Sequence, residues 1–129
     1  MKILVIDDND VDITIFSRVI EKKDPTIEVN TVCNGREGLE YLANEKSPPD
    51  LIFLDLFMPE TDGWYFLEHY QDLKLEKLPV LLVVSSSINP RDKQMSTDYP
   101  FVSAYLTKPF LPQVFEEALE IYRRESAKK

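Results

Sequence analysis

Short apolar runs alternate with longer amphipathic stretches along the chain, and this alternation repeats five times. Residues 3–6, 51–54 and 80–84 are continuous apolar runs, a pattern typical of strands that are buried on both faces. Residues 27–32 alternate between apolar and polar positions, which indicates a strand nearer the edge of a sheet. Residues 102–106 predict a short fifth strand.

Between these runs, apolar residues recur with helical spacing. The first helix is expected to end near residues 22–25, the second to run from after Asn34 to before 47–49, and the third to span 64–73. Residues 90–98 predict a fourth helix from a weak pattern, and a last helix follows. The residues expected to face the core are Val11, Ile15, Val19 and Ile20 in the first helix, Leu39 and Leu42 in the second, Phe66, Leu67 and Tyr70 in the third, and Val114, Phe115, Ala118, Leu119 and Tyr122 in the last.

Strands that alternate with helices predict an α/β fold, with a parallel sheet covered on both faces by helices in right-handed crossovers. The 129 residues are enough for one domain with one buried core. We find no internal repeat, low-complexity segment or linker.

Charge and composition narrow the possible functions. The formal net charge of -8 argues against nucleic-acid binding through a basic surface. Cys33 is the single cysteine, so no intramolecular disulfide can form and a reducing compartment is expected. No apolar run approaches the ~20 residues that a membrane-spanning helix requires, and acidic residues begin too early for a secretory signal. We therefore expect a cytoplasmic protein.

Polar residues follow four of the five predicted strands. In a parallel α/β sheet, ligands bind outside the carboxyl ends of the strands. The residues presented there are Asp7 and Asp8 after the first strand, Asp55 after the third, Ser85, Ser86 and Ser87 after the fourth, and Thr107, Lys108 and Pro109 after the fifth. Three carboxylates, a hydroxyl and an ammonium are thus expected to meet at one edge.

Carboxylates held close together raise one another's pKa unless a cation neutralises them. A hard divalent ion suits oxygen ligands, and magnesium typically takes one or two carboxylates together with water and phosphate. Lys108 supplies further positive charge and Ser85 a hydrogen-bond donor. The set fits the transfer of a phosphoryl group to a carboxylate. Taken alone, Asp7 and Asp8 would be read as a helix N-terminal pair.

Over essentially its whole length the chain resembles the receiver domain of two-component response regulators. The matching segments are Asp7-Asp8, Asp55-Leu56-Phe57-Met58-Pro59, Ser85 and Lys108-Pro109-Phe110. The spacing between Asp55, Ser85 and Lys108 also agrees. The resemblance implies the flavodoxin-like strand order 2-1-3-4-5, and a single receiver domain over residues 1–129 with no effector domain after it.

The resemblance also implies a phosphorylation site. Asp55 would be the phosphate acceptor. Magnesium (Mg2+) would be bound by Asp8, by Asp55 and by the backbone carbonyl of Phe57, while Asp7 would act through metal-bound water. Lys108 would pair with the phosphoryl oxygens.

The remaining implications concern the switch and its partners. Ser85 would move towards the phosphate and Tyr105 would follow it, although Tyr105 is equally well explained as an ordinary core residue. The phosphoryl donor would be a sensor histidine kinase or a histidine phosphotransfer protein. The output would pass to a downstream protein target, without direct contact to nucleic acid or membrane.

Two other functions fit parts of the pattern. A relay intermediate would pass the phosphoryl group on to another histidine. A small magnesium-dependent phosphohydrolase with an aspartyl-phosphate intermediate is another possibility. Enzymes of this kind, of the haloacid-dehalogenase type, need a second aspartate two residues after the nucleophile, where this chain has the large, apolar Phe57. A flavin-binding flavodoxin is rejected, because the acidic residues after the first strand would repel its phosphate.

Overall fold

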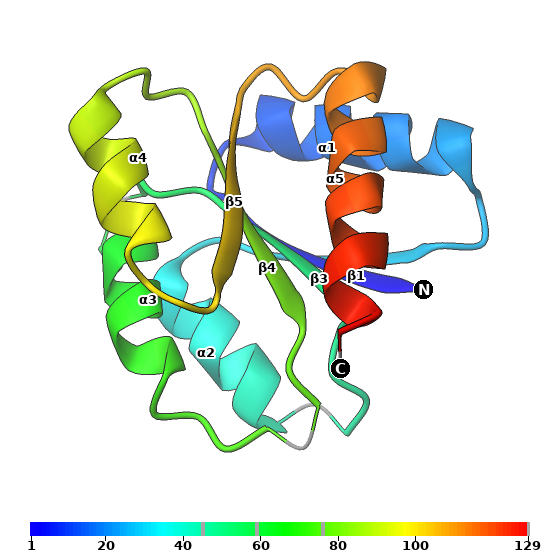
Figure 1. The fold of residues 1–129 in the computed structure, drawn as a ribbon. Coiled ribbons are helices and arrows are strands. Elements are labelled where there is room, and N and C mark those ends of the chain that lie inside the picture. The colour runs from blue at the N-terminus through cyan, green and yellow to red at the C-terminus, as the bar shows by residue number, and fades with distance from the viewer. Residues whose placement is uncertain (45, 59, 76, 129) are drawn as a thin grey trace.

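The computed structural model describes residues 1–44, 46–58, 60–75 and 77–128. In these residues, strands and helices alternate as β1 (Lys2–Ile6), α1 (Asp10–Lys23), β2 (Glu28–Val32), α2 (Gly35–Asn44), β3 (Leu51–Leu54), α3 (Gly63–Tyr70), β4 (Val80–Ser85), α4 (Pro90–Thr97), β5 (Val102–Thr107) and α5 (Pro112–Ser126) (Figure 1). The strands pair in parallel in the order β2-β1-β3-β4-β5. The predicted fold class and strand order are confirmed.

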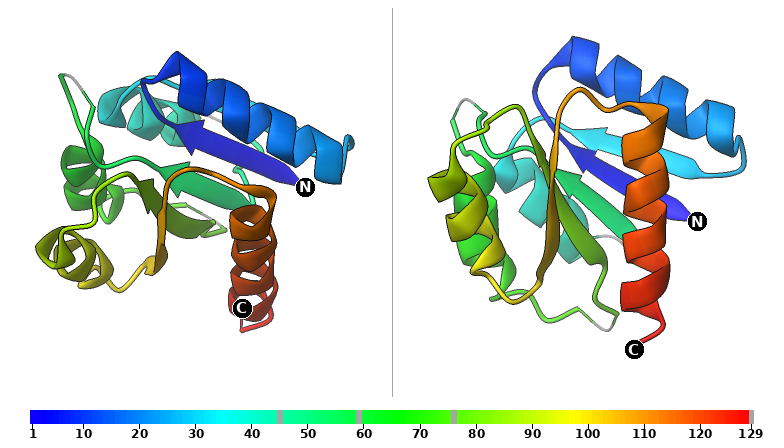
Figure 2. Two further views of the ribbon diagram at one scale, coloured as in Figure 1. Left: turned by 90° about the horizontal axis from the view of Figure 1, so that it is seen from above. Right: turned by 45° about the horizontal axis from the view of Figure 1, so that its top comes forward.

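Each face of the sheet carries its own apolar cluster, because successive strand residues point to opposite faces. Ile3, Val5 and Phe53 pack with α1 and α5 in one cluster. Leu4 and Leu54 pack with α2 and α3 in the other. Figures 1 and 2 show α1 and α5 on one side of the sheet and α2, α3 and α4 on the other. Burial on both faces explains the continuous apolar runs of β1, β3 and β4.

Side-chain caps lie at the start of four of the helices, and Asn34, just before α2, accepts a hydrogen bond from the Glu37 N–H. Asn9 accepts a hydrogen bond from the Asp12 N–H, Asp62 from the Tyr65 N–H, and Asn89 from the Arg91 N–H. Such caps satisfy backbone donors that a helix leaves unpaired at its N-terminus. The caps of α1 and α4 lie in the short loops after β1 and β4, so these helices begin near the carboxyl edge of the sheet.

The prediction that Val11 faces the core was wrong, because its side chain is 68% exposed. The first turn of α1 starts beyond the end of β1, and Phe16 and Ile20 are the buried residues of this helix. The third helix ends at Tyr70 rather than at residue 73, and Cys33 is exposed. None of the helices in the described part of the chain has the length and apolar content needed to cross a membrane.

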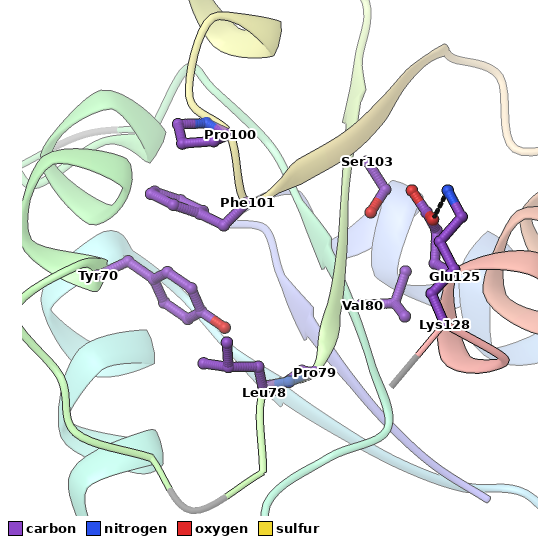
Figure 3. Close-up of a pocket in the computed structure, with 9 residues that line it drawn as sticks. All are labelled: Tyr70, Leu78, Pro79, Val80, Pro100, Phe101, Ser103, Glu125 and Lys128. Atoms are coloured by element: carbon purple, nitrogen blue, oxygen red, sulfur yellow. Dashed lines mark ion pairs between the residues drawn. The ribbon is translucent and has the colours of Figure 1, made fainter.

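A small hollow lies near the start of β4 and β5, at the amino end of the sheet (Figure 3). Its volume is about 220 Å³, and its lining includes Tyr70, Leu78, Phe101 and an ion pair between Glu125 and Lys128. The hydroxyl of Tyr70 is buried and has no hydrogen-bond partner in the structure. Burial raises the pKa of Tyr70 to about 12, so the hydroxyl stays protonated at neutral pH.

We expect the Tyr70→Phe variant to be more stable than wild type by about 1 kcal/mol, because an unpaired buried hydroxyl costs roughly that much or more. Urea unfolding of both proteins measures the difference. Tyr65→Phe is the matched control: Tyr65 lies on the same helix but is exposed, and the loss of its hydroxyl should leave stability nearly unchanged. A destabilised Tyr70→Phe variant would show that the hydroxyl finds a partner in solution.

Candidate functional site

Three carboxylates meet at the carboxyl ends of β1 and β3. Oxygens of Asp7, Asp8 and Asp55 all lie within 4.8 Å of one another. The backbone fixes two of these positions, because the Asp7 N–H donates to the Val32 carbonyl at 3.1 Å and the Asp55 N–H to the Ile6 carbonyl at 2.9 Å. Parallel pairing therefore continues one residue past the strand ends and holds these aspartates side by side.

The ammonium of Lys108 lies among these carboxylates. Its Nζ donates to Asp7 Oδ2 at 2.8 Å and to Asp12 Oδ2 at 2.7 Å, and it is 3.5 Å from Asp55 Oδ2. The Lys108 N–H donates to the Ser85 carbonyl at 2.9 Å, which anchors the lysine beside β4. The peptide bond between Lys108 and Pro109 is cis. The structure thus joins the predicted aspartates and lysine in one cluster.

Burial disfavours the charged form of the carboxylates at this site. It raises the pKa of Asp55 to about 6, and the Asp7 charge adds to this, while Lys108 and the Phe57 N–H act in the opposite direction. Burial also raises the pKa of Asp7, against hydrogen bonds from Lys108 and Asn9. Burial lowers the pKa of Lys108, but its bonds to Asp12 and Asp7 outweigh this and keep the pKa above its ordinary value. One ammonium does not neutralise the cluster, and the all-oxygen donor set fits a hard divalent cation.

Gly63 allows the start of α3 to lie against the backbone at the end of β3. A Cβ on Gly63 would overlap the Asp55 carbonyl oxygen and lie 2.7 Å from the Leu56 Cα. The Gly63 N–H donates to the Leu56 carbonyl at 3.0 Å. Any larger residue at this position would therefore push the loop after β3 out of place, and Asp55 with it.

Phe57 lies two residues after Asp55, and its side chain is 50% exposed. Its N–H interacts with the Asp55 carboxylate. Met58 is buried, while Pro59, which completes the segment that suggested a receiver domain, lies outside the described residues.

Ser85 and Tyr105 lie on the neighbouring strands β4 and β5 and are linked through Ser87. Ser85 is fully buried at the end of β4, and its Oγ accepts a hydrogen bond from the Ser87 N–H at 3.2 Å. The Tyr105 hydroxyl donates to the Ser87 carbonyl at 2.8 Å. The Ser87 hydroxyl donates to Asp92 in the first turn of α4 at 2.6 Å. The two predicted switch residues are thus connected by the loop between β4 and α4.

Sequence reasoning missed Asp12 and Gly63. Asp12 lies in the first turn of α1, and its partner Lys108 is 96 residues away in the sequence, so no local spacing pointed to it. No pattern pointed to Gly63, because its constraint arises from the Asp55 backbone, which only the fold brings against it.

The model of the response regulator receiver domain matches residues 3–120. The chain belongs to the receiver domain family of response regulators. Receiver domains are phosphorylation switches of two-component systems that are phosphorylated by histidine kinases, and they bind magnesium in an acidic pocket. In this receiver domain, Asp7, Asp8 and Asp55 form an acidic cluster at the strand ends.

Individual relatives agree with this assignment. The chain is 36% identical to the phosphorylated cyanobacterial phytochrome response regulator RcpA, with a TM-score of 0.77 and coverage of 93% of this chain and 89% of that one. The Mn(2+)-bound form of response regulator Rcp1 is 28% identical, with a TM-score of 0.75 and coverage of 93% and 90%. The sensor histidine kinase CheAY of Helicobacter pylori is 33% identical over 84% of this chain but only 13% of its own length. The chain spans half or less of the first curated relatives that it matches.

The raised pKa of Asp55 predicts a pH-dependent stability in metal-free buffer. Because this pKa is about 6 rather than 3.8, the folded state binds more protons than the unfolded state between these values. The stability that protonated Asp55 contributes is therefore lost as the pH rises from about 4 to about 6. We expect Asp55→Asn to exceed wild type in stability at about pH 7.5, with the difference shrinking towards about pH 4.

Urea unfolding in a chelator at several pH values measures this difference. Added magnesium should then stabilise wild type more than the variant, because the cation binds the folded carboxylates. A stability difference that stays constant between about pH 4 and pH 7 would contradict the raised pKa of Asp55.

Proposed function

We propose that this receiver domain is a signalling switch that accepts a phosphoryl group on Asp55 from a phosphohistidine partner and then alters its binding to a downstream protein. The observation that carries the proposal is the position of Asp55. It follows the central strand β3, lies close to two other carboxylates and is 3.5 Å from the Lys108 ammonium. The donor would be a sensor histidine kinase or a histidine phosphotransfer protein.

The transfer needs a nucleophile and positive charge around the phosphoryl oxygens. An Asp55 oxygen forms the new bond to phosphorus while the bond from phosphorus to the histidine nitrogen breaks, and the nitrogen keeps the electron pair. Lys108 donates to a phosphoryl oxygen. Magnesium, held by Asp8, Asp55 and the Phe57 carbonyl with Asp7 acting through water, would neutralise charge on the carboxylates and the phosphoryl group.

The signal would leave the site through the loop after β4. In this proposal the Ser85 hydroxyl donates to the new phosphate, and Tyr105, bonded to Ser87, follows the movement of the loop. The result is a population shift between two packings of the same fold. The target is a protein, because the net charge of -8 disfavours contact with nucleic acid.

The side chain at position 57 argues against turnover of outside substrates. An aspartyl-phosphate hydrolase of the haloacid-dehalogenase type needs a general acid two residues after its nucleophile, and the exposed ring of Phe57 cannot supply a proton. Without a general acid at this position, phosphorylation of Asp55 would suit a switch better than a hydrolase.

We expect acetyl phosphate with magnesium to add one phosphate mass to wild type and none to Asp55→Asn, because the amide of the variant is no nucleophile. Intact-mass spectrometry over time measures the gain. Asp8→Ala or a chelator should slow it several-fold through weaker metal binding. If Asp55→Asn gains phosphate at the wild-type rate, Asp55 is not the acceptor. An Asp8→Ala variant with unchanged magnesium dependence would remove Asp8 from the metal site.

We expect slow self-hydrolysis of the phosphorylated protein, and faster hydrolysis in Phe57→Asn. The attacking water must approach opposite the Asp55 oxygen, past the residues two after the acceptor and two after Ser85. An amide at position 57 could orient this water, whereas the Phe57 ring excludes it. Ser87 is poorly placed to help, because its hydroxyl already donates to Asp92.

Decay of the phosphorylated mass after removal of the donor measures the lifetime. Phe57→Leu is the control, since it shortens the side chain but keeps it apolar, and it should decay at nearly the wild-type rate. Equal or slower decay in Phe57→Asn would mean that Phe57 does not set the lifetime.

A further inference from the structure

Asp12 is a fourth carboxylate at the site, and it contacts the lysine rather than the oxygens of the other aspartates. Its Oδ2 lies 2.7 Å from Lys108 Nζ, the shortest of the three distances from this ammonium to a carboxylate. The Asp12 N–H is capped by the Asn9 side chain at 3.0 Å, so the start of α1 is held in place. The Asp12 side chain is 28% exposed and that of Lys108 only 10%.

An ammonium has three N–H donors. In this structure Lys108 directs one to Asp7 and one to Asp12, while Asp55 is farther away at 3.5 Å. Asp7 and Asp12 therefore hold the ammonium most closely, and of the three carboxylates Asp55 is the farthest from it.

We propose that Asp12 is a positioning residue that restrains Lys108 in the unphosphorylated protein and thereby disfavours the phosphorylated state. The inference rests on the proposed roles of Asp55 and Lys108. A phosphoryl group on Asp55 brings roughly −1.5 to −2 charges, if it behaves like other protein phosphates. It must attract Lys108 in competition with Asp12, and the Asp12 carboxylate also repels it.

Asp12 differs from Asp7, although both bond to Lys108. Asp7 is buried and also accepts the Asn9 N–H at 2.9 Å, so its loss would disturb the loop that carries the metal ligands. Asp12 is partly open to solvent, and its carboxylate bonds to Lys108. Removal of its charge should therefore free the Lys108 ammonium from this contact, with little effect on the rest of the site.

Removal of the Asp12 charge should change the free energy of unfolding only slightly. Its effect on the binding of a phosphoryl mimic can be told apart from that change. Damage to the fold would weaken the binding of any phosphoryl mimic, whereas release of Lys108 would strengthen it. Tighter binding in a variant that has lost a native ion pair is thus a result that a purely structural role of Asp12 cannot produce.

The experiment measures the affinity for beryllium fluoride, a non-covalent phosphoryl mimic, in saturating magnesium by calorimetry. Asp12→Asn keeps the size of the side chain and an acceptor oxygen but loses the charge, and it should bind about three- to tenfold more tightly than wild type. Asp10→Asn, an equal change of charge at an exposed position in the same helical turn, should bind as wild type does. In a Lys108→Met background, the gain from Asp12→Asn should become clearly smaller, because only the direct repulsion between Asp12 and the mimic is left to relieve.

Affinity in Asp12→Asn that equals or falls below that of Asp10→Asn would overturn the inference, as would a gain of undiminished size in the Lys108→Met background. If wild type binds the mimic and Asp55→Asn does not, such a result leaves the proposed function standing and removes Asp12 alone. If neither wild type nor Asp12→Asn binds the mimic, both the proposed function and this inference fail.

Discussion

One ammonium shared by several carboxylates is the interaction on which the site depends. Lys108 contacts Asp7, Asp12 and Asp55, and no arrangement of a single positive charge can neutralise all of them. Burial makes this excess of negative charge more costly, and it raises the pKa of Asp55. A site with this excess of negative charge favours any species that brings positive charge with it. A divalent cation would therefore suit the site by itself, whereas a phosphoryl group, which adds negative charge, would need such a cation beside it.

The fold supplies the rigidity that such crowding needs. Like charges move apart unless their backbones are fixed, and here β1 and β3 are buried on both faces and hydrogen-bonded to their neighbours. Gly63 lets the start of α3 press against the Asp55 backbone from the other side. Burial of the two apolar clusters thus stabilises a fold that keeps Asp7 and Asp55 close together against the repulsion between their charges.

The sequence alone predicted the strands well, because a continuous apolar run is a strong signal for a strand buried on both faces. The third strand was predicted with its observed bounds, Leu51–Leu54. The cluster of Asp7, Asp8, Asp55 and Lys108 followed from the rule that strand ends share one edge. Val11 was misplaced because helical spacing does not reveal where a helix extends past its sheet. Asp12 was missed because its partner is distant in sequence, at Lys108. The roles of the individual residues stay predictions.

The loop after β4 shows why a change at Asp55 would not stay local. Ser85 Oγ accepts the Ser87 N–H, and the Ser87 carbonyl accepts the Tyr105 hydroxyl. If Ser85 turns its hydroxyl towards a phosphate, the Ser87 N–H either loses its acceptor or moves with it. Ser87 is hydrogen-bonded to the Tyr105 hydroxyl through its carbonyl and to Asp92, in the first turn of α4, through its hydroxyl. Movement of Ser87 would therefore strain both hydrogen bonds. Because losing one of these partly buried hydrogen bonds costs about 1 kcal/mol, joint movement of Ser87, Tyr105 and Asp92 is the less costly response. Tyr105 and α4 would therefore change as one unit.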